Sequence, residues 1–135
     1  MKVAVSAMSG SLDAQVAPNF GRCPYFVVVE TETMDYEAIP NSGPSAAHGA
    51  GIQAARLVAG RGVRVVLTGN VGPNAFGALS SAGIEVVTGV SGSVREAVER
   101  YKRGELRGGV RGPTVGSHFG GGVGGRGRGR GWRRV

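Results

Sequence analysis

Short runs of apolar residues along the chain predict five β-strands. These runs are Lys2–Ala7, Tyr25–Glu30, Asp35–Ile39, Val63–Leu67 and Ile84–Val87. The first two are rich in valine and almost uninterrupted by polar residues, which is typical of central strands covered on both faces. The third is weaker, and the Pro/Gly-containing segment 40–44 ends it.

Three stretches in which apolar residues recur three and four apart predict helices. They are Gly49–Ala59, a helix that opens at Pro73 and stops at Gly83, and Val94–Arg103. Proline suits the first helical position because its missing N–H has no partner to lose there. The predicted inner face of the first helix consists of Ile52, Ala55 and Ala59.

The last helix has its own start signal. Ser93 followed by Glu96 forms a capping box, in which each side chain accepts a hydrogen bond from the other residue's backbone N–H. We also expect ion pairs one turn apart between Glu96 and Arg100 and between Glu99 and Arg103.

The order of these elements is β-β-β-α-β-α-β-α. Alternation of strand and helix from residue 35 onward predicts right-handed crossovers and a parallel part of the sheet. The first three strands lack intervening helices, which predicts an antiparallel meander. We therefore expect an α/β fold of the ribonuclease H-like kind: a mixed five-stranded sheet in the order 3-2-1-4-5, flanked by helices.

Composition and charge divide the chain into two parts. Its 135 residues allow one domain. Residues 1–106 carry nine basic and nine acidic side chains, so the net charge of +7 comes from seven arginines in residues 107–135. We predict a globular domain over residues 1–107 and a disordered Gly/Arg-rich tail over residues 108–135.

The tail suggests one function. Glycine and arginine alternate over residues 125–131, and Trp132 follows at once. Such segments contact nucleic acid through phosphate attraction and arginine stacking. The alternative is a solubilising appendage, which would bind nucleic acid only non-specifically and at low salt.

The connection between the first two strands is too long for a simple hairpin. It runs from Met8 to Pro24, and loops of that length in compact domains are usually functional or disordered. In the predicted topology it shares one edge of the sheet with residues 40–49 and 68–72. Two helix starts, near Gly49 and Pro73, also point toward this edge. Together with Arg22 they predict a pocket suited to an anion.

Two residues of this connection are expected to anchor it. Phe20 is an apolar plug, and Gly21 permits an unusual backbone angle. Cys23 has two readings, a small buried hydrophobe or a metal ligand whose thiolate is favoured by the neighbouring Arg22.

Other residues at this edge also allow two interpretations. His48 is either a helix cap or a ligand, while Asn19 and Asn70 are turn formers that could also touch a ligand. His118 lies in the tail, where only loose metal contact is expected.

Common catalytic patterns are missing from the sequence. It has no C-x-x-C, no H-E-x-x-H and no phosphate-binding G-K-[ST]. The first strand carries Lys2 and no carboxylate, so a two-metal nuclease site is not expected. We expect no enzyme activity, and an enzyme acting on phosphorylated ligands is the weakest alternative because no general base is evident. The single cysteine and the lack of a long apolar run predict a cytoplasmic protein without membrane contact.

Several segments, in order, resemble the dinitrogenase iron–molybdenum cofactor biosynthesis family, especially its small stand-alone archaeal and bacterial members. The matching segments are residues 1–6, Asn19–Phe26, Ala47–Gly51, Val65–Ala75, Ala82–Val86 and 97–106. They cover nearly all of residues 1–106. The nitrogenase carriers of this family have histidine where this chain has Asn19, which argues against a role in nitrogen fixation proper.

This resemblance implies a non-catalytic carrier or assembly factor for a metal–sulfur cluster, containing iron and molybdenum or another molybdenum cluster, or for its precursor. Its partners would be a cluster donor or acceptor protein. The expected cluster-binding residues are Asn19, Phe20, Gly21, Arg22, His48, Gly49, Gly69 and Asn70, with Cys23 and His48 as metal ligands. The alternative is a nucleic-acid-associated protein that acts through its tail.

Overall fold

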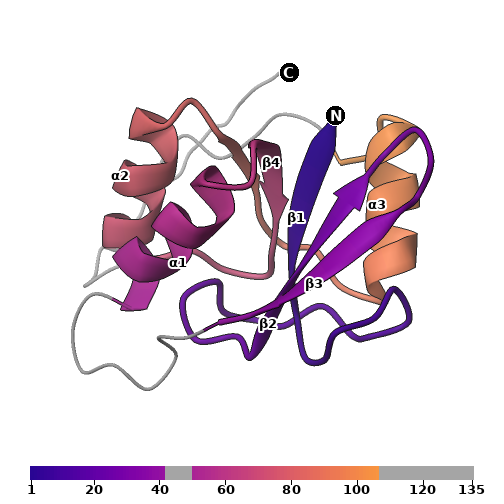
Figure 1. Cartoon of the computed structure of the whole chain (residues 1–135), viewed down its shortest axis with the longest axis horizontal. Coiled ribbons are helices and arrows are strands. Elements are labelled where there is room, and N and C mark those ends of the chain that lie inside the picture. Colours follow the sequence, from indigo (N-terminus) through magenta and orange to yellow (C-terminus); the bar gives the residue numbers. More distant parts are fainter. Residues whose placement is uncertain (42–49, 107–135) are drawn as a thin grey trace, which may run out of the picture.

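A five-stranded sheet with helices on both faces forms the body of the protein (Figure 1). The computed structural model describes residues 1–41 and 50–106. The strands are β1 (Lys2–Ala7), β2 (Tyr25–Glu30), β3 (Tyr36–Pro40), β4 (Val63–Leu67) and β5 (Glu85–Val87). The helices are α1 (Ala50–Ala59), α2 (Pro73–Ser81) and α3 (Val94–Lys102).

The strand order is β3-β2-β1-β4-β5, as predicted. β2 is antiparallel to β1 and β3, whereas β4 is parallel to β1 and β5. β1, β3 and β4 therefore run in the same direction and end at the same edge. The mixed five-stranded sheet is confirmed, and the ribonuclease H-like label stays a prediction.

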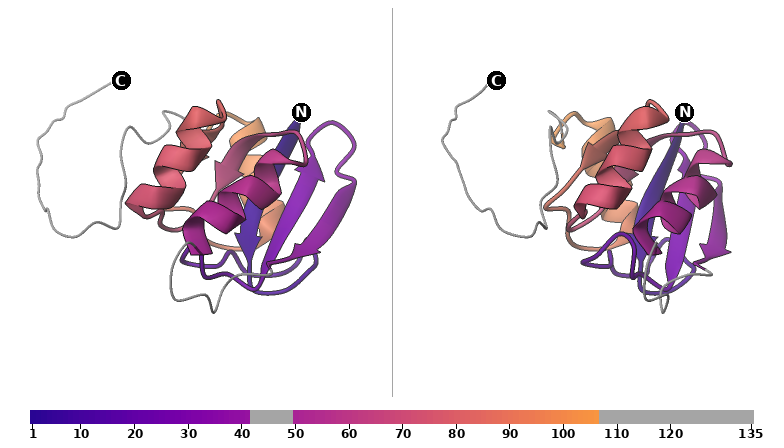
Figure 2. Two further views of the ribbon diagram at one scale, coloured as in Figure 1. Left: turned by 60° about the vertical axis from the view of Figure 1, so that its left-hand side comes forward. Right: turned by 90° about the vertical axis from the view of Figure 1, so that its left-hand side faces the viewer.

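Each face of the sheet has its own apolar layer. α1 and α2 cover one face, and α3 covers the other (Figures 1 and 2). Along β1, Ala4 packs into the α1–α2 layer, while Val3 and Val5 pack into the α3 layer. Burial on both faces explains why β1 is apolar at nearly every position.

The buried face of α1 differs from the predicted one. Ala50, Ala54, Ala55 and Val58 are buried, whereas Ile52 is half-buried and Ala59 is exposed. The prediction followed the spacing of apolar residues from Ile52, and of its three residues only Ala55 is buried. The contact is instead made by small residues, which allow α1 to approach its neighbours closely.

The capping box of α3 is confirmed: the Ser93 hydroxyl accepts from the Glu96 N–H, and the Glu96 carboxylate accepts from the Ser93 N–H. The predicted ion pairs are wrong. Arg100 and Arg103 instead reach Glu105, at 3.6 and 2.7 Å. Gly104, with a φ of +82°, turns the chain back so that Glu105 lies beside these arginines.

Several predictions fall outside the described residues. His48, Gly49 and the whole Gly/Arg-rich tail belong to this group. Within residues 1–41 and 50–106, no helix has the length and apolar character needed to cross a membrane.

Candidate functional site

The long connection between β1 and β2 is held to the sheet along its length. The Met8 N–H donates to the Gln15 carbonyl at 2.9 Å, and the Ala17 N–H donates to the Ser6 carbonyl at 2.8 Å. Further on, the Phe20 N–H donates to the Asn70 carbonyl at 3.0 Å. The connection is therefore a shaped surface at the carboxyl end of β1.

The first half of this connection hydrogen-bonds to the N-terminus of α3. The carbonyls of Leu12 and Ala14 accept hydrogen bonds from the N–H groups of Arg95 and Val94, both at 2.9 Å. These bonds satisfy donors at the start of α3 that a helix leaves open. The N-terminus of α3 is thus used internally, which leaves the second half of the connection as the candidate site.

A buried pair of hydroxyls supports that second half from below. Ser6, in β1, and Thr68, just after β4, are fully buried, and their oxygens lie 2.7 Å apart. The Ser6 hydroxyl also lies 3.0 Å from the Ala17 carbonyl, and the Thr68 hydroxyl lies 3.5 Å from the Asn70 carbonyl, so each hydroxyl has an acceptor in one of the two loops. This pair ties the ends of β1 and β4 to the connection at the point where the strand order reverses, the usual ligand position in open α/β sheets.

The loop after β4 contacts the connection directly. Asn19 and Asn70 form an isolated parallel bridge, and the Asn70 side-chain amide donates to the Pro18 carbonyl at 3.3 Å. The prediction that these two segments meet is confirmed. We call the surface formed by residues 17–23, residues 69–72 and the first turns of α1 and α2 the rim.

Glycines allow the segments of the rim to approach closely. A Cβ added to Gly69 would lie 2.6 Å from the Pro18 carbonyl oxygen, and one added to Gly21 would lie 3.0 Å from the Gly51 Cα. A Cβ on Gly51 would lie 3.0 Å from that of Ala75 in α2. The unusual backbone angle expected at Gly21 is wrong, since its φ is not positive. Close approach is the reason for glycine at this position.

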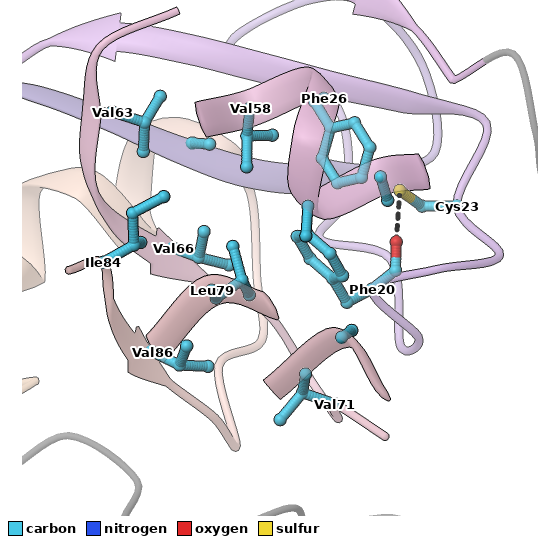
Figure 3. Packing of buried hydrophobic residues seen from close by; sticks show 14 of the residues in the cluster. Phe20, Cys23, Phe26, Val58, Val63, Val66, Val71, Leu79, Ile84 and Val86 are labelled. Atoms are coloured by element: carbon cyan, nitrogen blue, oxygen red, sulfur yellow. Dashed lines mark hydrogen bonds between the residues drawn. The ribbon is translucent and has the colours of Figure 1, made fainter. Parts of the chain in front are cut away.

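Phe20 is the predicted plug, and the structure confirms it. Its side chain is 1% exposed, and its ring centroid lies 5.0 Å from that of Phe26 (Figure 3). Both rings belong to the apolar layer under α1 and α2. In this conformation the Phe20 ring lies beneath the rim and holds it to the apolar layer.

Cys23 also points into this layer. The side chain is 2% exposed, and its thiol donates to the Phe20 carbonyl at 3.2 Å (Figure 3). Burial raises the pKa of Cys23 from 9.0 to about 12, against smaller opposing hydrogen bonds from backbone groups and Asn41. The expectation that Arg22 favours the thiolate is therefore wrong for this conformation, because desolvation outweighs any neighbouring charge.

Asn41 is a residue of the site that sequence reasoning missed. It directly follows β3, is 6% exposed, and its amide group donates to the carbonyls of Gly21 and Cys23 at 3.2 and 2.8 Å. The only sequence signal was an asparagine in a Pro/Gly-containing segment, where a turn former is the simpler interpretation.

Charge is distributed unevenly around the rim. Residues 14–29 and 38–84 contain no acidic side chain, and these two segments supply the whole rim. Arg22 is exposed on it. Four acidic residues lie instead in and next to the turn between β2 and β3, at the opposite end of the sheet in Figure 1: Glu30 at the end of β2, Glu32 and Asp35 in the turn, and Glu37 near the start of β3. The rim is thus the part of the domain suited to an anion.

The described part of the chain offers no ready-made site for a bare metal ion. Across residues 1–41 and 50–106, no three histidine, cysteine, aspartate or glutamate side chains gather closely enough to hold one. A metal that arrives as part of an anionic sulfide cluster needs fewer protein ligands, because sulfide already surrounds it. The residues present therefore fit an anionic cluster better than a free cation.

Comparison with known proteins gives the family. The dinitrogenase iron-molybdenum cofactor family matches residues 1–104. A curated protein of Methanocaldococcus jannaschii, itself uncharacterized, is 33% identical over 95 residues, which are 68% of this chain and 80% of its own.

Two solved structures support this result. The apo form of the orange protein from Desulfovibrio gigas is 43% identical with a TM-score of 0.81, and the match covers 84% of this chain and 96% of that one. A candidate NifB protein from Thermotoga is 32% identical with a TM-score of 0.69, covering 78% and 90%. The chain belongs to the dinitrogenase iron–molybdenum cofactor family.

Proposed function

We propose that this protein is a cytoplasmic, non-catalytic carrier or assembly factor for a metal–sulfur cluster, or its precursor, held at the rim. The observation that carries the proposal is the position of exposed Arg22 on a surface built wholly from segments without acidic residues. Thiometallate clusters are anions, and a surface that carries an arginine and no acidic residue attracts them. The proposed partners are a donor and an acceptor of the cluster.

The roles of the rim residues follow from their positions. Arg22 supplies the positive charge, and Asn19 is exposed in the same segment. Gly21 and Gly69 let the backbone segments pack closely, while Asn70 joins the two loops through Pro18. We propose that the cluster lies against this surface.

Three further residues stay proposals from the sequence alone. His48 and Gly49 lie outside the described residues, and we propose that they approach the same cluster. Cys23 is 2% exposed, so it could act as a metal ligand only after the loop around it opens. Molybdenum, bound with iron or copper through sulfide, is the proposed metal, because the family is described by its iron–molybdenum cofactor.

The direct test is anaerobic titration of the protein with tetrathiomolybdate and either iron(II) or copper(I). We expect visible absorption bands that co-elute with the protein in gel filtration. Arg22→Ala weakens this uptake, whereas Arg64→Ala, an exposed arginine in β4 at the far end of the sheet, leaves it unchanged. Failure of the wild-type protein to retain colour would count against the proposal.

A second candidate function rests on the separation of charge. All seven excess arginines lie in residues 107–135, while residues 1–106 are neutral overall. A nucleic-acid-associated role through this tail predicts binding that disappears when the chain ends at Arg107 and that falls steeply with salt. Fluorescence anisotropy with labelled RNA at two salt concentrations measures both effects.

A further inference from the structure

Asn41 holds three carbonyl groups of the segment before β2. Besides the side-chain bonds to the Gly21 and Cys23 carbonyls, its backbone N–H donates to the Pro24 carbonyl at 2.9 Å. Pro40, the preceding residue, is the ladder partner of Tyr25. Asn41 thus continues the β2–β3 pairing by one residue and then extends it with its side chain.

These bonds replace a partner strand that the segment lacks. Residues 21–24 have no regular secondary structure, and buried carbonyls need hydrogen-bond partners. The Asn41 side-chain amide donates to both carbonyls, and it also hydrogen-bonds the Cys23 thiol. Since a trans peptide holds its C=O and N–H in opposite directions, drawing the Gly21 carbonyl toward Asn41 turns the Arg22 N–H away from it.

As a result, two adjacent side chains differ sharply in their exposure to solvent. Arg22 is exposed, whereas Cys23 is buried against Phe20. We propose that Asn41 is the positioning residue of the rim, because its side-chain amide fixes the Gly21–Cys23 turn with Arg22 outward and Cys23 inward. Its importance for uptake of an anionic cluster rests on the proposed function, but its effect on the turn does not.

The single cysteine makes this inference measurable without any metal. Because Cys23 is the chain's one thiol, alkylation by iodoacetamide takes place in this turn and at no other thiol. We expect Asn41→Ala to raise that rate about tenfold in the folded protein, the effect of losing roughly one net buried hydrogen bond. Gln15→Ala, which removes an exposed amide from the same connection, is the matched control and keeps the wild-type rate.

Asn41→Asp tests whether the N–H donors of Asn41, and not only the shape of its side chain, hold the turn. The aspartate has the same size but offers at most one hydrogen, so we expect fast alkylation here as well. Asn41→Ser, with one donor, should lie between the wild type and the alanine variant if it reaches either carbonyl. A wild-type alkylation rate in both Asn41→Asp and Asn41→Ala overturns the inference. If the alanine variant does not fold, the aspartate and serine variants decide it in the same way.

Tetrathiomolybdate uptake then links the turn to the cluster. If the wild type retains the anion, Asn41→Ala should lose affinity by severalfold at a temperature where circular dichroism shows it fully folded. Equal uptake by this variant, despite fast alkylation, overturns the role at the rim. If the wild type takes up no anion but alkylation responds as expected, the proposed function fails and the positioning of the turn stands.

Discussion

Gly21 lies against the backbone of Gly51 with too little space for a side chain of its own. A Cβ on Gly21 would lie 3.0 Å from the Gly51 Cα and 3.1 Å from the Gly51 nitrogen, both backbone atoms that cannot rotate away. We therefore expect Gly21→Ala to destabilise the protein by about 1–3 kcal/mol, the usual range for overpacking. Urea denaturation followed by circular dichroism measures this change.

Gly77 supplies the matched control for that substitution. It lies on the exposed side of α2, and a Cβ there would meet no atom within 4 Å. Gly77→Ala should stabilise the protein by about 0.5–1 kcal/mol, since alanine favours the helix interior over glycine. If both variants change stability in the same direction, the close approach at Gly21 is not the reason for glycine there.

Phe20→Ala tests whether the plug supports the domain. The ring is 1% exposed and packs against Phe26, so its removal leaves a cavity in the layer under α1 and α2. The expected loss is about 3–5 kcal/mol in the free energy of unfolding. A loss below about 1 kcal/mol, typical of a surface position, would show that the loop is not anchored through this ring.

Ser93→Ala tests the start of α3. The variant loses the hydroxyl that accepts from the Glu96 N–H at 3.1 Å. We expect a cost of about 1 kcal/mol, as at other helix caps. Thermal unfolding compares this variant with Ser91→Ala, an exposed serine of the same turn, which should unfold at the wild-type temperature.

The buried thiol makes the free energy of unfolding depend on pH in the alkaline range. In the unfolded chain Cys23 loses its proton near pH 9.0, whereas burial raises the pKa in the folded protein to about 12. The stabilising contribution is complete below pH 9 and is lost as pH rises toward 12, at up to about 1.4 kcal/mol per pH unit.

Cys23→Ala removes this titration. Its free energy of unfolding should fall less steeply than that of the wild type in urea titrations between pH 8 and 10.5. Parallel curves for the two proteins would mean that the thiol ionises equally easily in the folded and unfolded chains.

The fold could be predicted largely from local patterns. Valine-rich runs mark the central strands β1 and β2, and the element order restricts the topology to the observed one. The buried face of α1 could not be predicted as well. It depends on how closely two helices approach, which the small residues Gly51 and Ala75 decide in three dimensions.

The segments that meet at the site could be predicted from the sequence, but the contacts between their residues could not. Parallel strand ends predicted that residues near Asn19 and Asn70 meet. Whether Cys23 faces solvent or core depends on hydrogen bonds from Asn41, which is 18 residues away in sequence. No periodic pattern carries that information, because the segment 21–24 has no regular secondary structure.

Metal and sulfide analysis of the protein, purified without oxygen from its native host, tests the central claim most directly. The rim is proposed to carry a metal–sulfur cluster, so molybdenum or iron should co-purify together with acid-labile sulfide in near-constant ratio to protein. The Arg22→Ala protein, expressed in the same host, should carry less of both. Wild-type protein that contains neither metal nor sulfide, from cells grown with molybdenum and iron, would contradict the account.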